Sequence, residues 1–464
     1  MTTDQNLPDC RDEEALLDIA RRVVASSPAD ETEVSVWRTE DTFVRYADSG
    51  PTQCADRSGL GIAVRARLAP EGGGSGFREA RATCSSGAAG DTAAAVERAV
   101  ALARVSPVTA DAPGLEGESG ARDETPAGLG ALLECQSGDL ANMVQGAVGA
   151  CLDEGLAPAG LVHVNVLGAA LANSAGRGVF AARGRAGMSL TASHPAGGSG
   201  WADAIVSEVS ALDGGAVVER ALQKARANRE PQSFPAGEYT VVLEPAAVTS
   251  LLLFASYQGF GAREVSEQAS LLCDRIGKQA FSPLVSIADD AFDERCPGLP
   301  FDGEGNPRRR VELIEAGVPG EPVTDALWAA RLGRENTGHG LGQPTPHGPF
   351  PKNLVVASGD ASLEELIAGV ERGLLVTQFH YTNMIEPREL MLTGMTRNGT
   401  YMIENGEVCG SVKNLRFTDS LVRILANVGA VGREAVACGA LFDGEMLTPA
   451  LRVEGFRFTS TTDF

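Results

Sequence analysis

The chain has 464 residues, of which 43% are hydrophobic and 22% charged, enough for a large buried core spread over two or three domains. Its 61 acidic and 39 basic residues give a net charge of −22, which disfavours binding to nucleic-acid backbones or anionic membranes. No apolar run is long enough to span a bilayer, and the amino terminus is acidic where a signal peptide is basic and then apolar. The nine cysteines form no CxxC pair, so we expect a cytoplasmic protein with reduced thiols.

The amino-terminal part shows the same predicted order of elements twice. Apolar residues at helical spacing or in short extended runs predict a helix, four strands and a closing helix. In the first copy these are residues 14–26, then 33–38, 42–46, 61–66 and 78–84, then 92–104. In the second they are residues 138–151, then 162–167, 169–172, 178–182 and 187–192, then 217–227. Both closing helices contain Val-Glu-Arg-Ala, which favours an internal duplication.

Two segments interrupt this pattern. Residues 106–128 are rich in Pro, Gly and acidic residues and predict a surface loop or a partly disordered connector. Residues 227–237 contain two prolines and a glycine after a predicted helix, which indicates a domain boundary. We therefore expect an amino-terminal α+β domain over residues 1–230 and a second domain over residues 231–464.

The carboxyl-terminal part is predicted to be mostly antiparallel β structure with packed helices, so the fold class is α+β with two domains. A strand at 238–243 runs into Pro245, which begins a helix reaching Gln258. Ser362 and Glu365 have the capping-box spacing of a helix start. Asn398-Gly399 and Asn405-Gly406 each predict a hairpin turn, so residues 389–408 read as a β-meander.

Few side chains form a recognisable chemical motif. There is no GxSxG elbow and no phosphate-binding GxxxxGK[ST], and the glycines near His339 lack the strand and helix of a dinucleotide site. The acidic residues between Asp289 and Glu304 suggest either a cation site or, as we favour, a solvated helix face followed by a turn. His339 and His347 lie in a Gly- and Pro-rich segment, residues 335–353, where they are either exposed on a loop or turned toward a ligand.

The stretch from Phe379 to Val408, together with residues 300–319 and 451–458, resembles the TldD/PmbA family. Members of this family pair as the TldD and TldE subunits of a metallopeptidase. The resemblance is strong from about Phe234 to the end of the chain and weak before it. It implies a peptidase cleft near residues 335–353, with His339, His347 and His380 as candidate cleft residues.

In the catalytic TldD subunit, a strand and a proline like those before Ala246 lead into a helix with the motif HExxxH. Its histidines bind zinc and its glutamate acts as base, and these three positions fall on Leu253, Phe254 and Gln258 here. Zinc needs imidazole, thiolate or carboxylate donors, so the departure predicts no metal site and no catalytic residue in this chain. Cys438 matches the place of a third ligand in the catalytic subunit, and is either a vestigial ligand or a buried cysteine.

These features favour a non-catalytic TldE (PmbA)-type subunit that completes the cleft of a heterodimer, with zinc held by the TldD-type partner. The substrate implied by the resemblance is a peptide or a small amide, including a natural-product precursor. One alternative is a metal-free homodimeric peptide-binding protein. Another alternative is an enzyme that uses Cys438 or Ser256 as nucleophile, for which the sequence shows no paired base.

Overall fold

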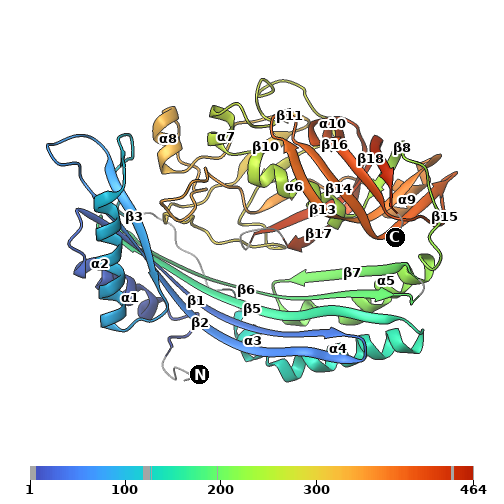
Figure 1. The fold of residues 1–464 in the computed structure, drawn as a ribbon, viewed down its shortest axis with the longest axis horizontal. Helices are drawn as coiled ribbons and strands as arrows, with labels where there is room; N and C mark the ends of the chain where they lie inside the picture. Colours follow the sequence, from blue (N-terminus) through green and yellow to red (C-terminus); the bar gives the residue numbers. More distant parts are fainter. Residues whose placement is uncertain (1–6, 119–125, 127, 196, 440–443, 463–464) are drawn as a thin grey trace.

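A computed structural model describes residues 7–118, 126, 128–195, 197–439 and 444–462. Two sheets, one from each half of the chain, lie one above the other with helices on their surfaces (Figure 1). The predicted α+β fold with two domains is confirmed. Among the described residues, no helix is both long and apolar enough to cross a membrane.

The amino-terminal sheet has, within the described residues, seven antiparallel strands in the order β4-β3-β2-β1-β5-β6-β7. Each copy of the predicted repeat contributes three main strands and not four. In the first copy the predicted runs 33–38 and 42–46 join into one long strand. In the second copy the four predicted runs join into two long strands, and the third strand, residues 199–206, was not predicted. At Gly168, between two predicted runs, the strand continues because β1 and β6 pair with it on both sides. An added Cβ there would lie 2.1 Å from the Cys10 carbonyl oxygen, so the glycine accommodates a close approach. The strands are β1 Glu31–Ala47, β2 Gly50–Leu68, β3 Phe77–Cys84, β4 Val108–Thr109, β5 Ala157–Asn173, β6 Gly178–Ser193 and β7 Ser199–Val206.

Helices cover one face of this sheet and form a single core with it (Figure 1). Their apolar residues, such as Leu16 in α1 and Val144 in α4, are fully buried against strand residues such as Val34 and Val164. In the described chain the order helix, three strands, helix occurs twice, in agreement with the predicted repetition. The helices are α1 Glu13–Ser26, α2 Ala89–Val105, α3 Leu129–Glu134, α4 Ser137–Asp153 and α5 Gly214–Ala227, with a 3-10 turn, η1, at Val209–Ala211.

The predicted connector at residues 106–128 is described only in part, since residues 119–125 and 127 lie outside the described residues. Val108–Thr109 pairs with the end of β3 as the edge strand β4. The predicted domain boundary at residue 230 falls in the segment between the end of α5 at Ala227 and the start of β8 at Gly237.

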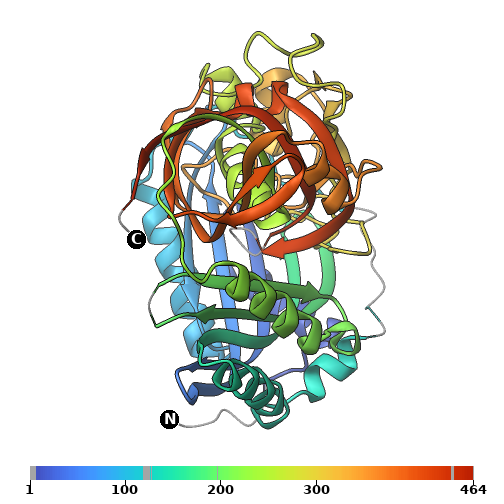
Figure 2. The same cartoon turned by 90° about the vertical axis from the view of Figure 1, so that its right-hand side faces the viewer.

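The carboxyl-terminal sheet closes on itself. β8 pairs in parallel with β13 on one side and antiparallel with β18 on the other, so β8, β13, β14, β16 and β18 form a ring (Figure 2). The strands are β8 Gly237–Leu243, β9 Ile287–Asp289, β10 Val311–Glu315, β11 Val318–Pro319, β12 Leu354–Val356, β13 Arg372–Glu386, β14 Met391–Glu404, β15 Glu407–Ser411, β16 Leu415–Ser420, β17 Val428–Gly439 and β18 Glu445–Thr461. The helices of this half are α6 Pro245–Gln258, α7 Ala262–Ser266, α8 Ala326–Leu332, α9 Leu363–Ala368 and α10 Leu421–Ala426.

Aromatic rings fill the core of this half. Phe379 of β13 lies with its ring centroid 4.6 Å from that of Phe417 and 5.6 Å from that of Phe456. Aromatic pairs at these separations add to the free energy of burial. Five residues of α6, Ala247, Val248, Leu251, Leu252 and Ala255, belong to the same cluster, which fixes the helix against the ring.

One of the two predicted hairpin turns is wrong. Asn398 and Gly399 have φ values of 57° and 131°, as a turn needs, but they form a bulge inside the continuous strand β14. The strand continues because β13 pairs with it on both sides of the bulge, up to Arg397 and again from Thr400. The second turn, at Asn405-Gly406, is confirmed as the hairpin between β14 and β15.

Candidate functional site

Helix α6 carries the positions where the family resemblance would place zinc ligands. Its first residue is Pro245, whose missing N–H costs nothing at a helix start. Leu253 and Phe254 are partly buried against the carboxyl-terminal core, and the hydroxyl of Ser256 donates to the carbonyl oxygen of Pro351. These side chains therefore pack and anchor the helix, and none is a metal donor.

Cys438 lies beside α6, near the end of β17. Its Sγ is 4.0 Å from the Thr448 hydroxyl, which in turn lies 2.9 Å from the hydroxyl of Thr249 on α6. Burial raises the pKa of the Cys438 thiol to about 11, so it is protonated at neutral pH. Among the described residues no group of three or more His, Cys, Asp or Glu side chains is placed to hold a metal ion. The donors present in this part of the chain therefore do not fit zinc.

A fully buried set of polar side chains lies elsewhere in this half, and we call Asp289, Arg308, His339 and Asn353 the polar node. Asp289 Oδ1 pairs with Arg308 and lies 3.0 Å from His339 Nε2, while its Oδ2 accepts from the backbone N–H of Asn353 at 2.9 Å. Arg308 Nη1 also donates to Asn353 Oδ1 at 2.7 Å. Burial alone would raise the pKa of Asp289, but Arg308, His339 and the Asn353 amide hold it well below its usual range. The node joins β9 to the 335–353 segment.

The prediction of a solvated acidic helix face is wrong. Asp289 is on strand β9 with its side chain fully buried. Asp302 and Glu304 are also buried, in a turn where Asp302 accepts from the backbone amides of Gly340, Glu304 and Asn306. The Asp289 carboxylate is thus paired with an arginine, and the Asp302 carboxylate accepts from backbone amides. The spacing of these residues along the sequence does not reveal these partners.

The three candidate cleft histidines lie in different surroundings, and within the described residues no hydrogen bond or ring contact joins any two of them. His339 is 2% exposed, so the exposed alternative is wrong for it; its Nδ1 lies 2.9 Å from the hydroxyl of Thr337. His347 is exposed, with its ring centroid 5.7 Å from that of Tyr257 on α6. His380 lies against Tyr381 on β13, and partial burial together with Arg397 lowers its pKa. Contact of any of them with a substrate stays a prediction.

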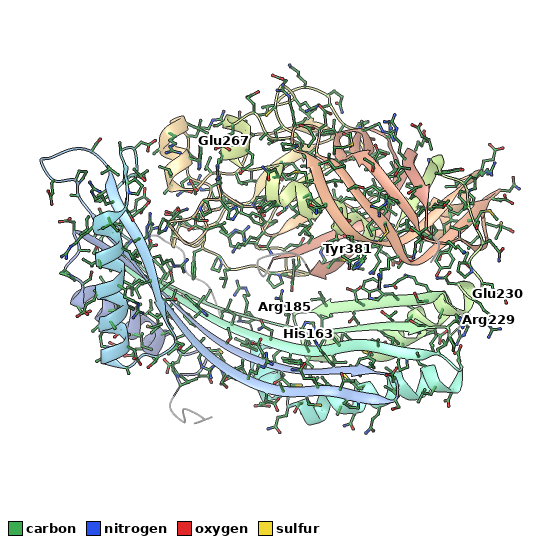
Figure 3. All side chains as sticks on the ribbon, in the orientation of Figure 1. His163, Arg185, Arg229, Glu230, Glu267 and Tyr381 are labelled. Atoms are coloured by element: carbon green, nitrogen blue, oxygen red, sulfur yellow. The ribbon has the colours of Figure 1, made fainter. Side chains whose placement is uncertain are left out.

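A cavity of about 330 Å³ lies between the two domains, and we call it the interdomain cavity. Its lower wall is the face of the amino-terminal sheet opposite the helices, where Arg185 and His163 are labelled in Figure 3. Its upper wall is formed by residues 297–303, 338–342 and 350–353, and it includes His339 of the polar node. This cavity was not predicted from the sequence. The alternation that puts Arg183 and Arg185 on one face of β6 was the signal available for it.

Arginines of the amino-terminal sheet also reach the acidic turn of the other domain. Arg65 Nη1 lies 3.4 Å from Glu304 Oε1, and Arg177 Nη1 donates to Asn306 Oδ1 at 2.6 Å. Burial is the main cause that raises the pKa of Glu304 to about 8; Arg65 opposes the shift, while nearby Asp302 and Asp325 add to it. These contacts fix the two domains relative to each other around the cavity.

Comparison with known proteins agrees with this geometry. Residues 236–460 match the family description PmbA/TldA metallopeptidase C-terminal domain. Residues 236–460 are thus similar to a domain of the PmbA/TldD family. A Haemophilus influenzae protein named metalloprotease TldD homolog is 27% identical over 218 residues, which are 46% of this chain and 44% of that protein. Metalloprotease PmbA of Escherichia coli O157:H7 is 24% identical over 194 residues, 41% of this chain and 40% of that protein.

The match therefore spans less than half the length of either relative. The fold extends further than the sequence similarity. The crystal structure of TldE from Thermococcus kodakarensis superposes with a TM-score of 0.83 at 22% identity, covering 96% of this chain and 99% of that one. The described chain thus shares its fold with that TldE structure, including the amino-terminal sheet, which precedes the residues that match the family description.

Proposed function

We propose that this chain is a non-catalytic, TldE-type subunit that pairs with a TldD-type subunit to form a zinc metallopeptidase acting on peptides or small amides. The observation that carries the proposal is the chemistry of α6, where Leu253, Phe254 and Gln258 stand at the three positions that need metal donors or a base. A domain of this family whose α6 packs into the core has no metal donor at these positions. Such a domain can help to shape a cleft, but it cannot activate a water molecule there.

The contribution of this chain would be structural and would centre on the interdomain cavity. A catalytic zinc site has three protein donors and one open position for water. Cys438 is the one donor beside α6 named by the resemblance, and its buried thiol carries a proton at neutral pH. We therefore expect zinc, when present in the complex, to be held by residues of the partner subunit.

The test is co-expression of a tagged copy with a TldD-type protein, followed by measurement of metal content and peptide cleavage. We expect the two chains to co-purify through a large interface, of the order of 2,000 Å² or more, as in obligate complexes. The complex should hold about one zinc ion, and the isolated chain none in stoichiometric amount. Cys438→Ala should change neither metal content nor cleavage.

Two outcomes would contradict the proposal. One zinc ion per isolated chain, or metal lost on Cys438→Ala, would show that this chain has a metal site of its own. A stable homodimer that does not bind the TldD-type protein would favour the metal-free peptide-binding alternative. The nucleophile alternative finds little support, because the Ser256 hydroxyl is buried and donates to the Pro351 carbonyl.

A further inference from the structure

The interdomain cavity is rich in positive charge although the chain as a whole is strongly acidic. Five basic side chains and two acidic ones line it among the described residues: Arg81, Arg183, Arg185, Arg308 and Lys352, with Asp302 and Glu445. The two carboxylates are already engaged, Glu445 with Arg185 at 2.8 Å and Asp302 with backbone amides. Arg185 and Arg308 are in turn paired with Glu445 and Asp289, so the wall carries an excess of positive charge and is not uniformly positive. An excess of one charge sign in a region of low dielectric concentrates ligands of the opposite sign.

Arg81 on β3 differs from the neighbouring arginines of the same sheet. Arg65 pairs with Glu79 at 2.7 Å, and Arg67 lies 3.3 Å from the same carboxylate. Arg81 has no carboxylate within ion-pair distance among the residues the structure describes, and its Nη1 donates to the Gly342 carbonyl oxygen at 3.3 Å. A guanidinium has five N–H donors in a planar fork, so Arg81 keeps donors for a ligand in the cavity.

The backbone of the 335–353 segment makes room for this guanidinium. A Cβ added at Gly342 would lie 2.3 Å from Arg81 Nη1, so a side chain there would displace the arginine. Apolar side chains complete the surroundings, with Trp37 and Leu171 on the sheet and Phe301 and Phe350 on the opposite wall. A mostly apolar cavity with a few fixed polar groups is the usual form of a small-ligand site.

We propose that Arg81 binds a carboxylate of a short peptide in the interdomain cavity. The carboxylate is either the carboxyl-terminal group of the peptide or an Asp or Glu side chain, both of which match the guanidinium fork through two parallel hydrogen bonds. The inference deepens the proposed function, since it takes the ligand to be a peptide. It concerns this chain alone and requires neither zinc nor a partner subunit.

The test is titration calorimetry of the purified chain with three probe peptides: acetyl-trialanine with a free carboxylate, its carboxyl-terminal amide, and acetyl-Ala-Asp-Ala-amide. The free acid should bind about 10- to 100-fold more tightly than the amide, the range expected for a hydrogen-bonded charge pair. Equal binding of the Asp peptide would assign the site to carboxylates in general. Preference for the free acid over the Asp peptide would assign it to peptide termini.

Arg81→Gln should remove the preference for a carboxylate and leave the weak binding of the amide unchanged. Gly342→Ala should have the same effect, because the added methyl group displaces Arg81 while every charge is retained. Arg78→Gln is the matched control: Arg78 is on the same strand, and its Nη1 donates to the Ser106 carbonyl oxygen at 2.7 Å, outside the cavity. It should bind all three peptides like the wild type.

Equal affinity of the wild type for all three peptides, or an unchanged preference for a carboxylate in Arg81→Gln, would overturn the assignment, as would the absence of binding to all three peptides. Far-ultraviolet circular dichroism and the melting temperature show whether each variant is folded. Failure of this inference can be told from failure of the proposed function. Co-purification with a TldD-type subunit and the zinc content of that complex should be the same for Arg81→Gln and the wild type.

Discussion

Helix α6 and the polar node belong to the same domain, and they differ in the residue types that each places in the core. The helix stands where a metal-binding motif is expected, and it presents Leu253 and Phe254 to an apolar core. The node contains the Asp, His and Arg side chains that suggest chemistry, and it uses them to join β9 to the 335–353 segment. A polar cluster can therefore be structural, and an apolar helix can occupy the positions where the family resemblance places a metal-binding motif. Four predictions test this contrast.

The largest expected effect is the loss of the charge at the centre of the polar node. Asp289→Asn would leave Arg308 buried without a carboxylate, and removing one member of a buried ion pair costs about 3 to 5 kcal/mol of unfolding free energy. Denaturant unfolding followed by circular dichroism measures this loss. Asp293→Asn is the control, because its partner Arg295 is 57% exposed and such pairs contribute at most about 1 kcal/mol. A similar loss of unfolding free energy in both variants would show that the polar node does not stabilise the fold.

A second prediction contrasts Asp289 with Glu304, whose pKa is raised to about 8 from an ordinary value of 4.5. The folded chain keeps a proton on Glu304 that the unfolded chain releases above pH 4.5, so this contribution to stability is lost as the pH rises toward 8. Asp289, with its lowered pKa, stabilises the folded chain throughout this range, and its contribution is lost only as the pH falls below its ordinary pKa of 3.8. Glu304→Gln should therefore flatten the decline in stability between about pH 5 and 8.

Unfolding at several pH values in that range measures this slope. Glu315→Gln serves as the control, since Glu315 is exposed on β10 and its charge faces solvent. Its slope should equal that of the wild type. A Glu304→Gln variant that keeps the full wild-type slope would mean that the carboxylate is ionised in the folded chain throughout the range.

The third prediction concerns the hydrogen bond that Ser256 of α6 donates to the Pro351 carbonyl oxygen. Ser256→Ala removes the hydrogen bond to the Pro351 carbonyl and leaves that oxygen unpaired, at a cost of about 1 to 2 kcal/mol. Ser250→Ala, whose hydroxyl donates to Ala246 within the same helix, is the matched control and should cost less. The same unfolding experiment distinguishes them. A Ser256→Ala variant that lost peptide cleavage in a complex, at unchanged stability, would instead support the nucleophile alternative.

The smallest effect is expected at His347, which lies exposed over Tyr257 of α6. His347→Ala should change the unfolding free energy by no more than about 0.5 kcal/mol, as for most surface substitutions. His339→Ala should cost far more, because it empties a position of the polar node. Reduced peptide cleavage by a complex containing His347→Ala would therefore indicate a role at the cleft, whereas the same result for His339→Ala would not.

The local signals in the sequence predicted the fold well. Pro245 begins α6, and Ser362 and Glu365 form the predicted capping box at α9. The signals failed where tertiary pairing overrode them, as at Asn398-Gly399, where strand pairing on both sides turned a hairpin signal into a bulge. The polar node could not be predicted, because Asp289 and Asn353 are 64 positions apart and only the folded chain brings them together.

The uninterrupted pairing of β1 with β5, from Glu33 and Asn173 to Ala47 and Ala159, constrains how this protein can evolve. Because side chains alternate between the two faces of a strand, one inserted residue would turn every later side chain of that strand to the wrong face. The cavity wall on the sheet can therefore diversify by substitution alone. The facing loops can also change in length, so new ligand preferences should arise from insertions there and from single replacements on the strands.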